Sequence, residues 1–222
     1  EGTAEERIVF VGNIMIDTLE ANREKAEALS IHDIIKNNLG DNYQPKATTP
    51  NDEGYALMTL HRPSNVDDII VLEPIIRFLL DEVAKDYTLI WPIHPRTRKN
   101  LMDFGLYEQV ANHPNLILLE PLGYFEMLRL NMTAKVMLTD SGGLQEECTI
   151  LGTPCLTLRW NTERPITLIE YGGASVLVGN NVERIRDEYR IAIAKRRIPV
   201  RPNLWDGKTA ERCLRAIIEK DK

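Results

Sequence analysis

Short apolar runs alternate with longer amphipathic segments through most of the chain. The runs have the length and composition of buried strands, and the segments between them repeat apolar residues at helical spacing. We expect strands at residues 55–60, 88–93, 116–119, 135–139, 155–158 and 175–178, followed in turn by helices at 67–84, 97–104, 124–132, 143–151, 165–171 and from 182 onward. Strands and helices that alternate in this way build a parallel sheet with helices on both faces. The sequence therefore predicts an α/β fold with a Rossmann-like, doubly wound parallel sheet.

The pattern changes at both ends of the chain. Residues 7–11 predict a short strand, an amphipathic stretch runs from Ile14 to about Lys36, and residues 48–53 predict a loop. After a turn-rich link at 201–207, residues 208–220 predict a helix with one apolar face, formed by Ala210, Leu214, Ile217 and Ile218. We expect this last helix either to pack on its own sheet or to cross to a neighbouring domain.

The stretch Thr139-Asp-Ser-Gly-Gly-Leu-Gln-Glu-Glu147 carries the strongest chemical signal. Here a strand passes into a helix through Ser141, Gly142 and Gly143, and glycines let the backbone approach a ligand closely. The start of a helix offers unpaired N–H groups and the positive end of the helix dipole, which favour phosphate. Glu147 lies roughly 9 Å along the helix from Ser141, where a carboxylate can accept hydrogen bonds from a ribose diol. The stretch suits a nucleoside diphosphate, although an ordinary turn followed by a solvated acidic helix has the same features.

Polar residues also follow the other predicted strands. They are His61, Arg62, Ser64 and Asn65; His94, Arg96 and Arg98; Glu120 to Tyr124; and Arg159, Asn161, Thr162, Glu163 and Arg164. In a parallel sheet these loops meet at the edge where the strands end, which is where ligands bind. Their arginines, histidines and hydroxyl groups predict a cleft for an anionic ligand.

Composition narrows the classes of partner. The 222 residues are 43% hydrophobic with a net charge of −6, which argues against nucleic acid as a partner. The basic run Lys195 to Arg197 is expected to be a solvated helix end or loop. Three cysteines without metal-ligand spacing are expected to be free thiols, so we expect no metal site. The sequence shows no apolar run long enough for a membrane helix and no signal-peptide pattern, which predicts a cytoplasmic protein without a membrane partner.

Five motifs give a family resemblance. Thr59-Leu-His-Arg-Pro-Ser-Asn65, Pro92-Ile-His-Pro-Arg-Thr-Arg98, Glu120-Pro-Leu-Gly-Tyr124, Asp140-Ser-Gly-Gly-Leu-Gln-Glu-Glu147 and Arg159-Trp-Asn-Thr-Glu-Arg-Pro165 resemble, in order and spacing, the non-hydrolysing UDP-N-acetylglucosamine 2-epimerases. That family has the GT-B architecture of two Rossmann-like domains, and this chain resembles its later part. The resemblance implies an interdomain segment with an amphipathic helix at 1–50, the UDP-binding domain at 51–200, and a C-terminal helix within 201–222 that returns toward the first domain.

The resemblance also implies roles for individual residues. Such enzymes interconvert UDP-N-acetylglucosamine and UDP-N-acetylmannosamine by eliminating UDP and adding it back, without a cofactor. His61 would stand near the diphosphate as a donor or acid, and Glu147 would hold the ribose. The remaining UDP-binding positions would be Arg62, Tyr124, Met127, Ser141, Gly142, Gly143 and Arg164. The acid/base carboxylates of the family lie in the first domain, so we expect this chain alone to be inactive and the whole protein to be a homodimer.

Two positions depart from the family pattern. Many members have His-Arg-Arg-Glu-Asn where this chain has His61-Arg-Pro-Ser-Asn65. His94 corresponds to a histidine that helps some bacterial members bind a second, activating substrate molecule, which implies an allosteric role, but the residues after it differ. Two alternative functions remain: the UDP-sugar-binding domain of a GT-B glycosyltransferase, and a nucleotide-sugar-binding module without catalysis.

Overall fold

One parallel sheet forms the centre of the protein. The computed structural model describes residues 2–40, 43, 45–47, 49–50 and 54–220, so most of the loop expected at 48–53 lies outside the described residues. The strands are β1 (Tyr55–Thr59), β2 (Thr88–Pro92), β3 (Leu116–Leu119), β4 (Val136–Thr139), β5 (Cys155–Thr157) and β6 (Ser175–Leu177). They lie in the order β3-β2-β1-β4-β5-β6, and every neighbouring pair is parallel. This sheet confirms the predicted Rossmann-like, doubly wound fold.

The strand order reverses in the middle of the sheet. The chain moves outward from β1 through β2 to β3, returns to place β4 beside β1, and then moves outward again through β5 to β6. Ligands of open α/β sheets bind beyond the carboxyl ends of the strands at such a reversal. The loops after β1 and β4, which begin at Leu60 and Asp140, therefore flank the expected binding position.

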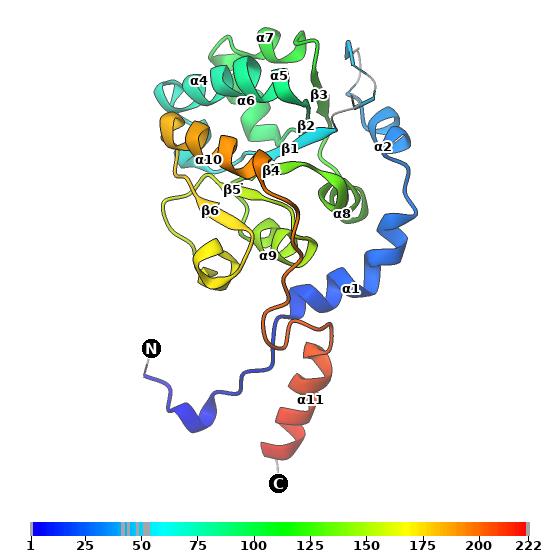
Figure 1. Cartoon of the computed structure of the whole chain (residues 1–222), viewed down its shortest axis with the longest axis vertical. Helices are drawn as coiled ribbons and strands as arrows, with labels where there is room; N and C mark the ends of the chain where they lie inside the picture. The colour runs from blue at the N-terminus through cyan, green and yellow to red at the C-terminus, as the bar shows by residue number, and fades with distance from the viewer. Residues whose placement is uncertain (1, 41–42, 44, 48, 51–53, 221–222) are drawn as a thin grey trace.

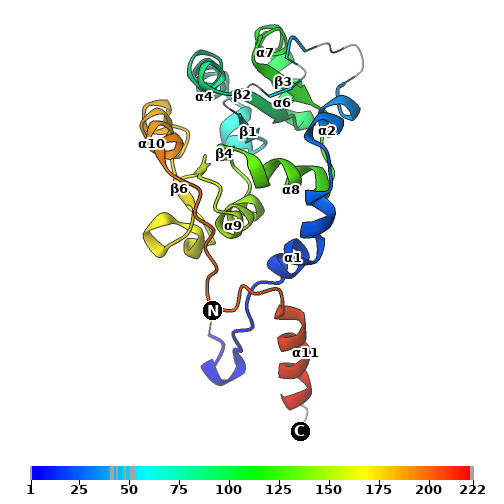
Figure 2. The ribbon, with the colours of Figure 1, turned by 45° about the vertical axis from the view of Figure 1, so that its right-hand side comes forward.

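Helices cover both faces of the sheet (Figure 2). On one face lie α3 (Pro63–Val66), α4 (Ile69–Phe78), α5 (Ala84–Asp86), α6 (Pro95–Asp103), α7 (Tyr107–Ala111) and α10 (Val182–Ala194). On the other lie α2 (Ile31–Asn37), α8 (Tyr124–Thr133) and α9 (Gly142–Leu151). Successive strand residues point to opposite faces, so Met58 and Trp91 pack in the first layer while Leu57 and Ile90 pack in the second.

The helix expected at 67–84 is divided into several pieces. After α3, the side chain of Asp68 accepts a hydrogen bond from Ile70 N (2.9 Å) and starts α4. A π-helical turn at Leu79–Val83 (η2) then joins α4 to α5. Two short 3-10 turns, η3 (Pro165–Thr167) and η4 (Ile169–Tyr171), occupy the short helix expected at 165–171.

The N-terminal segment differs from the sequence prediction in two ways. The strand predicted at 7–11 is wrong, because a 3-10 turn at Glu5–Arg7 (η1) is followed by residues that form no ladder with any described strand. The single amphipathic stretch from Ile14 to Lys36 is two helices, α1 (Ile14–Glu27) and α2. The side chain of Ser30 accepts from Asp33 N (3.3 Å), and this N-cap separates the two helices.

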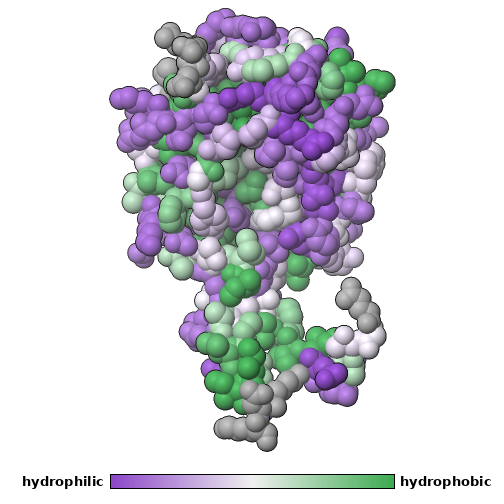
Figure 3. Space-filling model, turned by 180° about the vertical axis from the view of Figure 1, so that it is seen from behind, coloured by the Kyte–Doolittle hydropathy of each residue, from purple (hydrophilic) through white to green (hydrophobic). Residues whose placement is uncertain are grey.

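The last helix, α11 (Thr209–Lys220), stands away from the sheet (Figure 1). Asp17 of α1 holds its first turn by accepting from Thr209 N (3.0 Å) and Ala210 N (2.8 Å). Figure 3 shows apolar surface on the part of the molecule that stands away from the sheet. The exposed apolar residues of α11 and of the neighbouring N-terminal segment are Leu214, Ile217 and Ile218, and Ile8, Val9 and Phe10. The alternative that α11 packs on its own sheet is therefore wrong.

Polar groups of the chain itself cover the outer edge of β3. The hydroxyl of Tyr43 donates to the carbonyl of Leu116 (3.1 Å) and accepts from Leu118 N (3.2 Å). Glu120 N donates to the carbonyl of Asn38 (2.8 Å). At the opposite edge, Leu168 forms a bridge with Ser175 of β6.

Arg197 is inserted between two helix ends, contrary to the solvated position expected for the run Lys195 to Arg197. Its guanidinium donates to the carbonyls of Leu151 at the end of α9 (3.2 Å) and of Asn131 (3.0 Å) and Ala134 (2.8 Å) at the end of α8. The last carbonyls of a helix have no partner within it. Arg197 therefore ties the ends of α8 and α9 together.

None of the helices in the described part of the chain has the length and apolarity that crossing a bilayer requires.

Candidate functional site

A cavity of about 370 Å³ opens at the carboxyl ends of β1, β2 and β4. It lies at the reversal of strand order, and α8 and α9 complete its walls. Seven of the residues to which the family resemblance assigns roles line it: His61, His94, Tyr124, Met127, Ser141, Gly143 and Glu147. Residues far apart in the sequence thus meet at one cavity, as a cleft at the strand ends requires.

The start of α9 forms one wall of this cavity. Ser141 is the N-cap residue in an extended conformation, but its side chain accepts no hydrogen bond from the helix. Its own N–H donates to Thr139 Oγ1 (3.0 Å), and that hydroxyl is 2.7 Å from Thr59 Oγ1 on the neighbouring strand. Because the cap leaves the first N–H groups of α9 without a side-chain acceptor, they are available for an anion.

Glu147 is a second functional group on α9 that lines the same cavity as Ser141. It is buried, and burial, with a contribution from the charge of Glu146, raises its pKa to about 7; the nearby Asn131 side chain acts in the opposite direction. Burial and the charge of Glu147 also raise the pKa of Tyr124 to about 12. The buried position at the cavity wall therefore disfavours the charged form of this carboxyl group, and hydrogen-bond donors on a ligand would favour it.

His61 enters the cavity from the loop after β1 and is held by Asp140. Its Nδ1 lies 2.7 Å from Asp140 Oδ1, and Asp140 is completely buried whereas the His61 side chain is 39% exposed. Burial opposes ionisation of Asp140, but the hydrogen bonds from His61 and Arg62 outweigh it and lower the pKa of this carboxyl group. Asp140 belongs to one of the five motifs, but no sequence pattern indicates that it is the partner of His61.

Three predicted residues, Arg62, Gly142 and Arg164, lie beside the cavity without lining it. Arg62 Nε donates to the carbonyl of Asp140 (2.8 Å). Arg164 Nε lies 3.1 Å from Glu146 Oε1, and the same guanidinium pairs with Glu163. A Cβ atom added at Gly142 would lie 2.3 Å from Arg164 Nη1, so the guanidinium rests directly against the first turn of α9.

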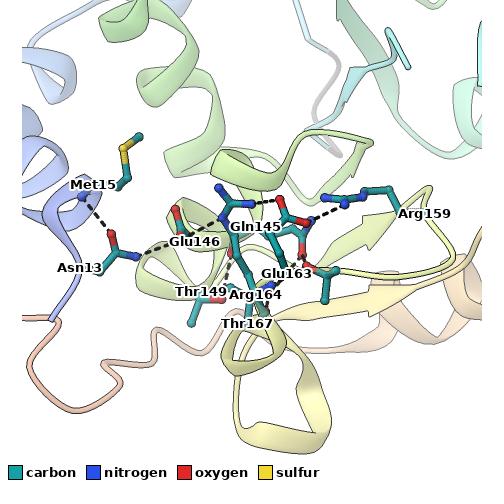
Figure 4. A network of polar contacts seen from close by, with 10 residues as sticks. Asn13, Met15, Gln145, Glu146, Thr149, Arg159, Glu163, Arg164 and Thr167 are labelled. Atoms are coloured by element: carbon teal, nitrogen blue, oxygen red, sulfur yellow. Dashed lines mark hydrogen bonds and ion pairs between the residues drawn. The ribbon is translucent and has the colours of Figure 1, made fainter. Parts of the chain in front are cut away.

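The sequence prediction missed the network around Glu146 that Figure 4 shows. Besides meeting Arg164, the buried Glu146 accepts from Asn13 Nδ2 (2.9 Å), while Asn13 caps α1 by accepting from Met15 N (2.9 Å). On the adjacent position, Gln145 Oε1 accepts from the hydroxyls of Thr162 (3.0 Å) and Thr167 (3.2 Å). The helix that carries Ser141 and Glu147 is thus fixed to the N-terminal segment and to the loop after β5.

His94 combines a structural contact with a position at the cavity. Its Nδ1 accepts from Arg96 N (3.1 Å) and caps α6. Its ring centroid is 5.5 Å from that of His61. Within the described residues, no three His, Cys, Asp or Glu side chains are grouped as a metal site would need.

A wholly parallel sheet with a cavity at its reversal of strand order defines a Rossmann-like α/β domain. The chain belongs to the UDP-N-acetylglucosamine 2-epimerase family, whose sequence profile matches residues 1–218. This membership confirms the resemblance drawn from the five motifs.

Individual relatives show how much of such a protein the chain represents. The UDP-N-acetylglucosamine 2-epimerase of Methanocaldococcus jannaschii is 38% identical over 98% of this chain and 56% of that protein. The UDP-2,3-diacetamido-2,3-dideoxy-D-glucuronate 2-epimerase of Pseudomonas aeruginosa is 32% identical over 84% of this chain and 51% of that protein. A crystal structure of the M. jannaschii enzyme in complex with UDP-GlcNAc and UDP matches with a TM-score of 0.81 and 36% identity, over 98% of this chain and 56% of that one. The chain spans about half the length of these relatives.

Proposed function

We propose that the chain is the nucleotide-binding part of a UDP-N-acetylglucosamine 2-epimerase, which interconverts UDP-N-acetylglucosamine and UDP-N-acetylmannosamine. The observation that carries the proposal is the single cavity in which the uncapped start of α9, His61 and Glu147 meet. A nucleoside diphosphate needs an anion site and an acceptor for its ribose diol, and this cavity offers both. The M. jannaschii relative crystallised with UDP-GlcNAc and UDP supports this assignment.

Each predicted residue has a place in this proposal. The N–H groups after Ser141, at Gly142 and Gly143, bind phosphate oxygens, and Arg164, resting against Gly142, adds positive charge. Glu147 accepts from the ribose hydroxyls, and Tyr124 and Met127 line the space for uracil. His61 faces the diphosphate, and Arg62 supports its loop through the carbonyl of Asp140. His94 lies at the same cavity, where a second substrate molecule would act as an allosteric ligand.

Epimerisation by elimination and re-addition of UDP needs groups outside this cavity. A base must remove a weakly acidic proton from the sugar while the diphosphate is stabilised as it leaves. We place the base in the part of the parent protein that faces this cavity across a GT-B cleft, so the chain alone binds nucleotide without turnover. The exposed apolar residues of α11 are the surface through which we expect the C-terminal helix to contact that other domain. We also propose a cytoplasmic homodimer for the whole protein.

Titration calorimetry with UDP tests the nucleotide-binding proposal directly. We expect UDP to bind the chain, and Glu147→Ala to weaken binding by about 30-fold or more, because a carboxylate that accepts two hydroxyl hydrogen bonds contributes roughly 2–3 kcal/mol. Glu24→Ala removes an exposed carboxylate from α1 and serves as the matched control. Undetectable UDP binding, or equal loss in both variants, would count against the proposal.

Gly143→Ala is expected to stabilise the chain while weakening UDP binding. A Cβ atom at 143 meets no atom within 4 Å, and alanine in a helix is more favourable than glycine by about 0.5–1 kcal/mol. The added methyl group occupies space beside the first turn of α9, where a phosphate would lie, so we expect at least a tenfold loss in affinity. Urea unfolding measures the first effect and calorimetry the second; unchanged affinity would exclude a phosphate at this turn.

The two alternatives are separated by products. Full-length parent protein incubated with UDP-N-acetylglucosamine and no acceptor yields the manno sugar only if it is an epimerase. A glycosyltransferase requires an acceptor, and a binding module without catalysis yields no product. The P. aeruginosa relative is named for a diacetamido glucuronate sugar, so the same assay with that nucleotide sugar tests which sugar is the substrate.

A further inference from the structure

Asp140 joins the two loops that lie on either side of the reversal of strand order. Its carboxylate is completely buried. Oδ2 accepts from the backbone N–H groups of His61 (2.9 Å) and Arg62 (2.7 Å) and from Asn65 Nδ2 (3.1 Å). Oδ1 lies 2.7 Å from His61 Nδ1 and receives no hydrogen bond from any other group in the described part of the chain.

We propose that Asp140 is a positioning residue that fixes the hydrogen of neutral His61 on Nδ1. A nitrogen and an oxygen at 2.7 Å repel each other unless a hydrogen lies between them. The three N–H donors on Oδ2 favour the ionised carboxylate. Although burial opposes ionisation, the contact with the His61 side chain and the backbone N–H groups of Arg62 and His61 lower the pKa of Asp140. The hydrogen therefore belongs to His61, as in other histidines whose tautomer is set by a buried aspartate.

The fixed tautomer decides what His61 can do at the cavity, a step that rests on the proposed binding of a nucleoside diphosphate. With Nδ1 directed at Asp140, neutral His61 presents a bare Nε2, which can only accept a hydrogen bond. A diphosphate also only accepts, so Nε2 binds it only when His61 carries a second proton. The groups that face His61 around the cavity are the carboxyl groups of Asp140 and Glu147, the imidazole of His94 and the phenol of Tyr124.

Asp140→Asn reverses this arrangement without changing the shape of the side chain. The amide oxygen must stay at the Oδ2 position, because three N–H groups point at it. The NH2 group then takes the Oδ1 position and donates to Nδ1, which moves the hydrogen of neutral His61 to Nε2. In the variant, neutral His61 can donate to a diphosphate.

Nitrogen NMR of the histidine rings in the chain tests the tautomer without any ligand. Above the pH range in which histidine titrates, we expect His61 to be in the Nδ1–H form in the unsubstituted chain and in the Nε2–H form in Asp140→Asn. Asn65→Ala removes a different contact of Asp140 and should keep the Nδ1–H form. An Nε2–H form in the unsubstituted chain, or an unchanged tautomer in Asp140→Asn, would overturn the proposal. If the variant does not fold, the measurement on the unsubstituted chain alone decides.

The pH dependence of UDP binding gives the second measurement. We expect the affinity of the unsubstituted chain for UDP to fall by about tenfold as His61 loses its Nε2 proton, because a charge-assisted hydrogen bond to the diphosphate is lost. Asp140→Asn should lose this alkaline decrease. Equal pH dependence in both proteins would overturn the proposed role of Asp140. Absence of UDP binding in both would refute the proposed function and leave the tautomer result standing.

Discussion

Replacing Arg197 with alanine is expected to lower the free energy of unfolding by about 3 kcal/mol. The guanidinium donates to three carbonyls at the ends of α8 and α9, and each such bond is worth about 1 kcal/mol when it is partly exposed and made by a charged donor. The substitution leaves carbonyls of two helix ends without this partner, and both helices line the cavity at the strand ends. Urea unfolding at neutral pH measures the loss.

Arg196→Ala is the matched control for this experiment. Arg196 precedes Arg197, is exposed, and forms no hydrogen bond or ion pair with the described residues. Its substitution should change the free energy of unfolding by less than about 0.5 kcal/mol. Similar effects of the two substitutions would mean that net charge, rather than the carbonyl contacts, accounts for the loss.

Glu147→Gln is expected to make the ligand-free chain more stable by about 3 kcal/mol at pH 8. The pKa of Glu147 rises from 4.5 to about 7 on folding, and each pKa unit corresponds to about 1.4 kcal/mol. Since the folded pKa is the higher one, the contribution of Glu147 to stability is fully present below pH 4.5 and is lost as the pH rises toward 7. Glutamine carries no charge, so the variant does not lose this contribution.

The pH series contains its own control. At pH 4, Glu147 is mostly neutral in both the folded and the unfolded chain, so the unsubstituted chain and the variant should have similar unfolding free energies. The difference in unfolding free energy between the two proteins should increase as the pH rises above 4.5 and become constant above the folded pKa of about 7. A difference that does not vary with pH would show that Glu147 keeps an ordinary pKa. Greater stability together with weaker UDP binding would identify Glu147 as a residue retained for the ligand at a cost to the fold.

The sequence predicted those features that depend on local periodicity. Apolar runs located every strand, and residues directly after the strands, such as His61 and Ser141, proved to share one cavity because carboxyl ends of parallel strands meet. The division of the amphipathic stretch at Ser30 was also readable, since Ser30 and Asp33 have the spacing of a helix N-cap. The predicted strand at 7–11 was wrong because strand propensity describes a surface to pack against, and the described chain provides no partner.

Long-range partners could not be predicted in this way. Asn13 and Glu146 are 133 positions apart, and His61 and Asp140 are 79 apart, so no local pattern connects them. Arg197 appears in the sequence as one of several adjacent basic residues, and only the packing of α8 against α9 gives it three carbonyls to bind. The candidate site residues were therefore accessible from the sequence, whereas the groups that hold them in place required the structure.

The hydroxyl of Tyr43 occupies the positions at the outer edge of β3 that a further strand would use. An open strand edge is a template on which a second polypeptide can add itself, and such addition is a common start of aggregation. Here the edge of β3 is closed by the side chain of Tyr43, and the carbonyl of Asn38 occupies Glu120 N just beyond the strand. We therefore expect the sheet to resist edge-to-edge pairing at β3 even at high protein concentration.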